Sequence, residues 1–243
     1  MKTKIFLGAT IALAILTACG GSSSTNNNVN KHSNNQSSGQ PDVYAYPKYT
    51  LSQENKNDIA YMGNEERLAY DVYTYLYNFH LNNGTTIKQL SNIANNSETR
   101  HIETVRDLVK KYNLSPSDLT NLDSSNAPVA SSTTPQDELP SGEYDINHIQ
   151  ELYNTLVAKG ENSTKDALEV GCMVEVTDIN DLNPKIDNAI ASGAEDLQVA
   201  FEFLRSGSYN HYWAFDKGLK NLGISDGCCA LGSEWCHPEY PQE

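Results

Sequence analysis

Glu98 and His101 are the two residues of this chain whose types and spacing most directly suggest chemistry. They lie three residues apart in the stretch SETRH, so on a helix both side chains project from the same face. The apolar residues around them predict that this face is buried. A carboxylate and an imidazole that point together into a helical core are typical of a metal-binding bundle.

Three other helical segments place acidic residues or a histidine among apolar positions. Glu66 interrupts the apolar stripe of one segment, Glu175 and Asp178 lie one turn apart on another, and His211 occupies a core position of the last. Taken singly, each is more simply a structural residue, held by hydrogen bonds or by an arginine.

Taken together, these six residues would be expensive to bury. An unpaired buried carboxylate costs several kcal/mol, and the total would exceed the roughly 5–15 kcal/mol that holds a domain together. One or two cations at the centre would remove this cost. Carboxylate and imidazole ligands favour iron or manganese, with zinc as a further candidate.

Heptad-like spacing of apolar residues predicts the four long helices that would position these side chains. We expect the third to begin with a capping interaction between Ser163 and Asp166, and Pro184 to end or bend it. The expected helices cover residues 59–76, residues 86–113 with Asn113 as a left-handed cap, a third segment from residue 162 or 163, and residues 197–222 with Gly223 as the stop.

A further helix, at about residues 144–158, carries only packing residues on its apolar face, and residues 115–142 have the composition of a long surface loop. The sequence therefore predicts an all-α fold over residues 51–223. This fold is a four-helix bundle with an additional helix in a long crossover.

Four segments resemble the ferritin-like family known as domain of unknown function 2202. They are EERLAYDVY, SETRHIETV, ALEVGCMVEVTDINDL and SGSYNHYWAF, and the resemblance covers roughly residues 52–222. It implies a ferritin-like four-helix bundle. Glu66, Ala69 and Tyr73 look like the Glu-x-x-Ala-x-x-x-Tyr pattern of rubrerythrins within the wider superfamily.

The other candidate ligands also match positions of that superfamily. Glu98 and His101 are similar to its Glu-x-x-His on the second helix, Glu175 and Asp178 to the pair of acids on the third, and His211 to the histidine on the fourth. The resemblance thus implies a di-metal carboxylate site.

The chain departs from this pattern at Ser208, where a complete di-iron site would have an acid. Asp178 could compensate, and a single-metal site is the alternative. Tyr73 could orient a ligand carboxylate from outside the ligand set, or be a buried aromatic residue with a satisfied hydroxyl. The resemblance implies a first ion held by Glu66, Glu98 and His101 and bridged by Glu175, and a weaker second ion near Asp178 and His211.

The start of the chain predicts export. Residues 1–18 have a basic start, a short apolar run and small residues at the end, as in a signal peptide. The ending Leu-Thr-Ala-Cys resembles the lipobox of bacterial lipoproteins, which implies acylation of Cys19, and Gly20 in place of Asp implies the outer membrane. Residues 19–50, rich in Gly, Ser and Asn, read as a disordered tether.

The amino-acid composition limits the classes of molecule that the chain could bind. A net charge of −14 argues against binding nucleic acid or anionic lipid through basic residues. The membrane would therefore be contacted through the lipid anchor. Nothing in the chain resembles a nucleotide fingerprint or a Ser-His-Asp nucleophile.

The C-terminal segment, residues 224–243, contains three cysteines and lacks helical periodicity. In an exported protein Cys228, Cys229 and Cys236 favour one or two disulfides over a metal site. Cys172, in the third long helix, is interpreted as a small core residue. The sequence does not determine the pairing.

The resemblance implies redox chemistry with oxygen or peroxide, of oxidase, ferroxidase or peroxidase type. The substrate is not implied. The competing interpretation is a non-catalytic binding or structural lipoprotein that retains a vestigial or single-metal site.

Overall fold

The computed structural model describes residues 39–123 and 139–242, and within them every regular element is a helix. The expected all-α fold is therefore confirmed. The expected signal peptide, Cys19 and most of the expected tether lie outside the described residues, as does much of the expected loop. Among the described residues no helix combines the length and apolar character needed to cross a membrane.

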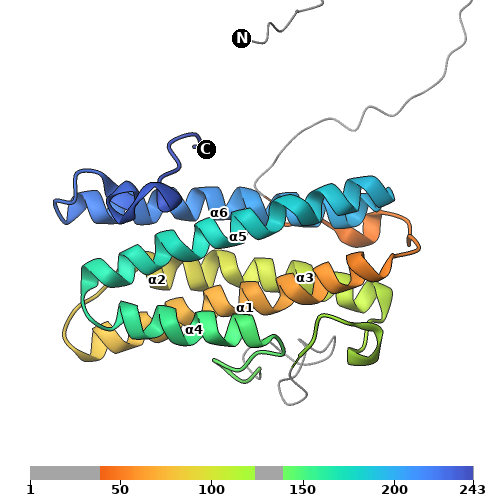
Figure 1. Ribbon diagram of the computed structural model, residues 1–243, viewed down its shortest axis with the longest axis horizontal. Helices are drawn as coiled ribbons and strands as arrows, with labels where there is room; N and C mark the ends of the chain where they lie inside the picture. Colours follow the sequence, from red (N-terminus) through yellow and green to blue (C-terminus); the bar gives the residue numbers. More distant parts are fainter. Residues whose placement is uncertain (1–38, 124–138, 243) are drawn as a thin grey trace, which may run out of the picture. The chain divides into compact units, whose positions relative to one another are not determined.

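Four long helical segments lie side by side and form the bundle (Figure 1). The second is divided into three parts, and α4 (Asn147–Gly160) packs against α1 and α5 within the crossover. The four segments are α1 (Gln53–Asn82), then α2 (Lys88–Ile93) with η2 (Ala94–Glu98) and α3 (Thr99–Tyr112), then α5 (Thr164–Ser192), and finally α6 (Glu195–Asn221).

The predicted helix ends are correct where a side chain or a left-handed residue defines them. Asn113 has φ 53° and ψ 46°, the left-handed cap expected after α3. The Ser163 side chain accepts a hydrogen bond from the backbone N–H of Asp166 at the start of α5.

We expected Pro184 to end or bend α5, and the first alternative is wrong, because the helix continues to Ser192. Proline removes one backbone hydrogen bond and costs about 3 kcal/mol in a helix interior. Leu182, Ile186 and Ala189 offset this cost, since all three are buried in an apolar cluster shared with α6. Tertiary packing thus overrides the local preference of proline.

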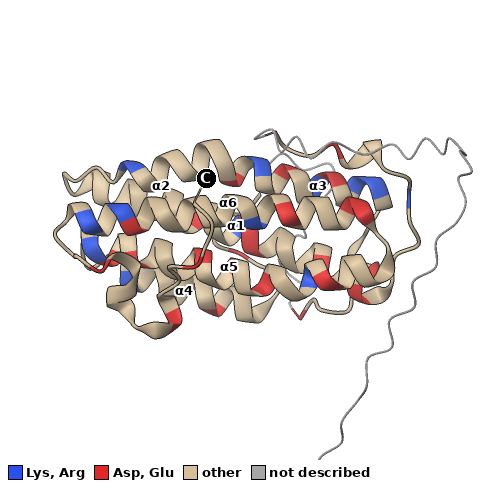
Figure 2. Ribbon diagram, turned by 90° about the horizontal axis from the view of Figure 1, so that it is seen from above, with Lys and Arg blue, Asp and Glu red and all other residues tan. Residues whose placement is uncertain are grey.

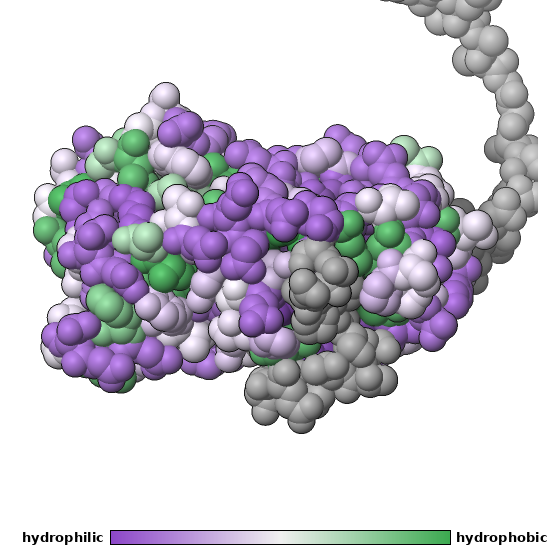
Figure 3. Space-filling model, turned by 60° about the horizontal axis from the view of Figure 1, so that its bottom comes forward, coloured by the Kyte–Doolittle hydropathy of each residue, from purple (hydrophilic) through white to green (hydrophobic). Residues whose placement is uncertain are grey.

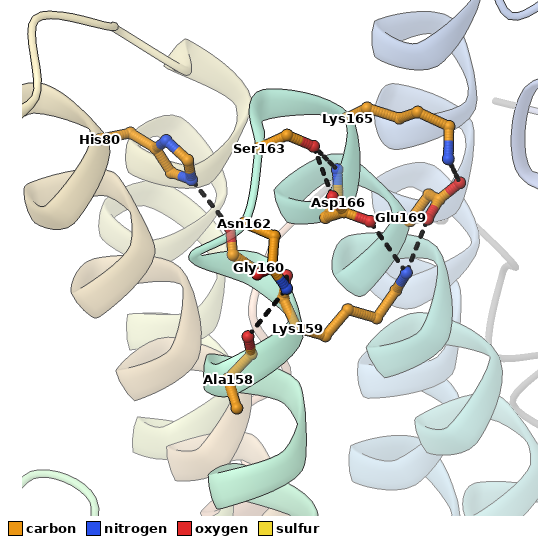
Figure 4. Close-up of polar contacts among 9 residues, drawn as sticks. All are labelled: His80, Ala158, Lys159, Gly160, Asn162, Ser163, Lys165, Asp166 and Glu169. Atoms are coloured by element: carbon orange, nitrogen blue, oxygen red, sulfur yellow. Dashed lines mark hydrogen bonds and ion pairs between the residues drawn. The ribbon is translucent and has the colours of Figure 1, made fainter.

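The junction between α4 and α5 fixes the crossover against α1 (Figure 4). His80 of α1 contacts the backbone O of Gly160 through Nε2 at 2.8 Å. Lys159 donates to Glu169 Oε2 at 2.7 Å, and Lys165 also pairs with Glu169. A Cβ at position 160 would lie 2.4 Å from Leu76 Cδ1, so only glycine allows this close approach.

The bundle core consists of two apolar clusters. One contains Tyr73, Leu90 and Phe215, and the other contains Met62, Leu108 and Phe201. On each of the four long segments the candidate ligands fall between residues of the first cluster and residues of the second. The candidate site therefore lies in the middle of the bundle, with an apolar layer on either side.

Both ends of the described chain are attached to the bundle. The compact unit begins at Gly39, and Val43 in η1 (Val43–Ala45) is buried. Residues 39–50, which we expected in the tether, therefore belong to the body of the protein. Lys111 donates to the backbone oxygens of Val43 and Tyr46, which holds this segment against α3.

The C-terminal segment forms η5 (Gly227–Leu231) and η6 (Ser233–Trp235) and contains two disulfides. Cys172 is bonded to Cys228, and Cys229 to Cys236. Cys172 is thus more than the small core residue that we expected, because it joins α5 to this segment. Its partner could not be inferred from sequence, since the contact spans 56 residues.

Candidate metal centre

A π-helical turn lies next to the site. The expected continuous helix of residues 86–113 is instead divided by η2, which ends at Glu98, and His101 follows in the first turn of α3. A π turn contains one more residue than an α turn and is often found at functional sites. The direction of Glu98 therefore depends on this turn and not on regular α-helical spacing.

Glu66, Glu98 and His101 form the first group of potential ligands. His101 Nδ1 lies 3.0 Å from Glu66 Oε2 and 3.2 Å from Glu98 Oε2. One ligand atom from each residue lies within 4.8 Å of the other two, and all three side chains are buried. The group joins α1 to the second bundle segment.

Glu98, Glu175 and His211 form the second group, which meets the same distance criterion. His211 Nδ1 lies 3.0 Å from Glu98 Oε1 and 3.4 Å from Glu175 Oε2. Each oxygen of Glu98 therefore faces a different histidine. The shared carboxylate is Glu98, whereas the sequence led us to expect Glu175 in that position.

Tyr73, Asp178 and Ser208 surround the two groups. The Tyr73 hydroxyl donates a hydrogen bond to Glu175 Oε1, and the Ser208 hydroxyl donates to Asp178 Oδ2 at 2.5 Å. Asp178 is buried beside the site but belongs to neither three-residue group. Its carboxylate is held by the serine that occupies the position where the resemblance led us to expect an acid.

Several buried atoms of these residues have no hydrogen-bond partner among the described residues. They are Glu66 Oε1, His101 Nε2 and Asp178 Oδ1, whereas Glu98 Oε1 and His211 Nδ1 face each other at 3.0 Å. Buried polar atoms are normally hydrogen-bonded. Two ligand atoms on one ion at about 2.0–2.2 Å lie at most about 4.4 Å apart, close to the spacing in both groups. The residues present therefore fit a metal ion.

The electrostatics of the site also favour a cation. Burial, and next the charge of Glu98, raise the pKa of Glu66 well above its usual value. Burial would raise the pKa of Glu98 as well, but His211 and His101 lower it. Burial would lower the pKa of His211, yet Glu175 and Glu98 raise it to about 10. Protons on the imidazoles thus balance negative charge that a bound metal ion would neutralise instead.

Gly207 brings α6 close to the first group. A Cβ at this position would lie 2.3 Å from His101 Nε2, so a larger residue would displace the imidazole. His101 also contacts the ring of Phe203, with a centroid distance of 5.4 Å. The sequence analysis overlooked Gly207, because a glycine in a helix carries no signal of what it faces.

Glu65 is the other residue that the sequence analysis overlooked. It is buried, and neither of its carboxylate oxygens has a hydrogen-bond partner among the described residues. The only sequence feature that could have pointed to Glu65 is its position beside Glu66. That feature is weak, because adjacent residues of a helix project in different directions. Asp71, another acid of α1, accepts hydrogen bonds from Tyr144 and from the backbone of Gly142.

Comparison with known proteins identifies the family. The profile of the family described as “Uncharacterized protein domain (DUF2202)” matches residues 55–125 and 130–233. The chain belongs to this family. The match includes all six candidate ligands and both ends of the disulfide between Cys172 and Cys228.

An archaeal relative is similar in sequence and structure. The chain is 34% identical over 181 residues to “Uncharacterized protein MJ0754” of Methanocaldococcus jannaschii, over 74% of this chain and 83% of the relative. A crystal structure of that hypothetical protein superimposes with a TM-score of 0.59, covering 73% of this chain and 86% of the other. The similarity in sequence and fold thus extends to an archaeal protein.

Proposed function

We propose that this member of the DUF2202 family is an exported, lipid-anchored, ferritin-like protein with a dinuclear iron or manganese centre of oxidase, ferroxidase or peroxidase type. The observation that carries the proposal is the pair of buried three-residue groups that share Glu98. A carboxylate that offers one oxygen to each of two neighbouring groups is suited to bridge two ions. The unpartnered atoms around it support the same conclusion.

The geometry supports an assignment of ligands to each proposed ion. Glu66 and His101 would hold one ion, Glu175 and His211 would hold the other, and Glu98 would contact both. This mixture of oxygen and imidazole ligands suits iron or manganese. Such ions, when bound, supply redox chemistry with oxygen or peroxide. The small oxidant would therefore be the reaction partner.

The surrounding residues would orient the ligands and limit access of water. Tyr73 holds one oxygen of Glu175 and leaves the other directed toward His211. Ser208 holds one oxygen of Asp178, and the other has no partner among the described residues. The apolar clusters on both sides exclude water, which strengthens electrostatic interactions within the site.

The proposed location depends on the first residues of the chain. Lipidation at Cys19 after removal of residues 1–18 would attach the protein to the bacterial cell envelope. Because Gly20 and not Asp follows the cysteine, the resemblance to lipoproteins implies the outer membrane. Radiolabelled palmitate should be incorporated by the full-length chain and not by a Cys19→Ala variant. Incorporation by both would contradict the proposed anchor.

Metal analysis of variants tests the proposed centre. Protein purified without chelator from cells supplied with iron or manganese should contain two equivalents of metal. Glu98→Gln should lose both, because its side chain belongs to both groups, whereas Glu66→Gln and Glu175→Gln should each lose mainly one.

Glu169→Gln is the matched control. Glu169 is also a buried acid of α5, but it pairs with Lys159 and Lys165 away from the candidate ligands. This variant should keep its metal. A wild-type chain without bound metal, or equal metal content in Glu98→Gln and wild type, would contradict the proposed centre.

The second candidate function is a non-catalytic binding or structural protein with a single ion or a vestigial site. Two observations favour it. Position 208 holds a serine where a complete di-iron site would have an acid, and Asp178 lies outside both groups. Consumption of ferrous iron or peroxide by the metal-loaded protein distinguishes the two functions. Metal binding without turnover would favour the second candidate.

A further inference from the structure

A row of acidic residues leads away from the proposed centre along α5. Glu175, Asp178 and Asp181 follow one another at three-residue intervals. Each step of three residues turns by about 300°, so successive side chains are displaced by about 60° around the helix. Glu175 and Asp178 are accordingly buried, whereas Asp181 is partly exposed. The row therefore connects the centre with the surface.

Glu65 of α1 faces this row. Its exposed fraction is 2%, and neither of its carboxylate oxygens has a hydrogen-bond partner among the described residues. On α1, Glu65 lies between Tyr61, whose hydroxyl donates to Asp181, and Tyr73, whose hydroxyl donates to Glu175, so this part of α1 runs along the row. Glu65 thus lies between an acid beside the centre and an acid at the surface.

Lys185 is the cation next to this row, and it is held by contacts other than an ion pair with the acids. Lys185 Nζ donates to the backbone O of Asp181 at 2.9 Å and lies 4.1 Å from the centroid of the Tyr61 ring. No ion pair joins it to Glu65 or Asp181 in the described part of the chain. A buried acid with only a structural role would normally be paired or hydrogen-bonded.

We propose that Glu65, Asp178 and Asp181 form the route by which divalent cations pass from solvent to the metal centre, an inference that rests on the proposed function. Among the described residues, these three do not form a group with ligand atoms within 4.8 Å of one another, unlike the two central groups. A cation at Glu65 would therefore have few protein ligands and would be held weakly. Weak binding suits passage, because a tightly held ion would not move on.

The charge of the molecule supports entry of cations. The chain has 31 acidic and 17 basic residues, and acidic positions occur along α1 and α5 (Figure 2). Negative charge at the mouth of a buried path raises the local concentration of cations and their association rate. Asp181, whose Oδ2 accepts a hydrogen bond from Tyr61 at 2.9 Å, is the outermost acid of the row.

The rate of metal uptake tests the route. The full chain, stripped of metal with a chelator, is mixed with Co²⁺, and binding is followed by the visible absorbance of the ion. Glu65→Gln and Asp181→Asn should each slow uptake about tenfold, by the loss of electrostatic attraction along the path. The final amount of bound Co²⁺ and its spectrum should match the wild type, because the central ligands are intact.

Asp187→Asn is the control, since Asp187 is an exposed acid of the same helix beyond the row. Its uptake rate should equal that of the wild type. Wild-type rates in both Glu65→Gln and Asp181→Asn, or a changed spectrum at saturation, would overturn the route. If Glu65→Gln does not fold, the rate of Co²⁺ uptake by Asp181→Asn tests the route by itself. Absence of Co²⁺ binding by the wild type would instead contradict the proposed function.

Discussion

At the scale of single residues, Glu98 matters most, because its two oxygens face two different histidines. Glu66 and Glu175 each belong to one group, so their loss would leave the other group complete. Two further residues influence the centre by contact with these ligands. Tyr73 does so through a hydrogen bond to Glu175, and Gly207 through the absence of a side chain beside His101.

Tyr73→Phe should weaken metal binding by about 10–100-fold, because a hydrogen bond that orients a ligand is lost. The hydroxyl that donates to Glu175 disappears, while the ring that packs on Phe215 is kept. Titration calorimetry with Mn²⁺ measures the change. Tyr144→Phe is the control, since Tyr144 donates to Asp71 outside the site and should retain wild-type affinity.

Gly207→Ala should lower the free energy of unfolding by about 1–3 kcal/mol, because the added methyl group overpacks the site. Its Cβ would lie 2.3 Å from His101 Nε2. Gly63→Ala is the control within a helix. There the Cβ would lie 3.4 Å from Val105 Cγ1, and a gain of about 0.5–1 kcal/mol is expected. Urea denaturation measures both, and equal effects would contradict the close contact with His101.

At the scale of elements, the π turn η2 is the feature that places Glu98. A regular α-helix from α2 through α3 would contain one residue fewer between Leu90 and His101 if both kept their present positions. Leu90 is fully buried and His101 nearly so, which means that the bundle fixes both sides of the turn. The extra residue is therefore accommodated within η2, the turn that ends at Glu98.

Deletion of Asn96 should abolish or strongly reduce metal binding while the chain remains helical. Closing the turn must either redirect Glu98 or displace α2 from its packing. Asn96→Ala keeps the number of residues and should bind metal normally, because Asn96 is exposed. Metal analysis and circular dichroism together measure the outcome. Normal metal content after the deletion would show that the turn does not position Glu98.

At the scale of the whole molecule, the centre lies between two apolar clusters, and the C-terminal segment is joined covalently to the bundle. Figure 3 shows that one face of the surface is mostly hydrophilic, with separate apolar residues among the polar ones. Most large apolar side chains of the described residues are buried, and Tyr44, Tyr75, Leu81, Ile190 and Leu222 are the exposed ones. The two disulfides differ in the length of chain that they enclose, which leads to a prediction about stability.

Replacing Cys172 and Cys228 by serine should cost about 4 kcal/mol in the chain-entropy account of disulfides, and replacing Cys229 and Cys236 about 2 kcal/mol. The reason is loop length, since the first pair is separated by 56 residues and the second by 7. Thermal denaturation of the two double variants measures the order. A larger loss for the second pair would contradict this explanation.

Much of the fold could be predicted from the sequence, because helix periodicity and caps are local properties. Apolar spacing predicted the all-α bundle, and Asn113 and Ser163 marked helix ends correctly, since their backbone geometry and hydrogen bonds involve only near neighbours. The six candidate ligands were also recognisable, because acids and histidines at apolar positions are conspicuous in a periodic pattern.

Only the tertiary structure decided the relations between distant segments. It determined that Glu98 is shared by two groups, that α5 continues through Pro184, and that Cys172 pairs with Cys228. It also packed the part of α1 that carries Glu65 against α5, where Tyr61 donates a hydrogen bond to Asp181. The physical reason is the same in each case: these outcomes depend on which helix faces lie together, and the energies of packing and of long-range contacts outweigh local preference.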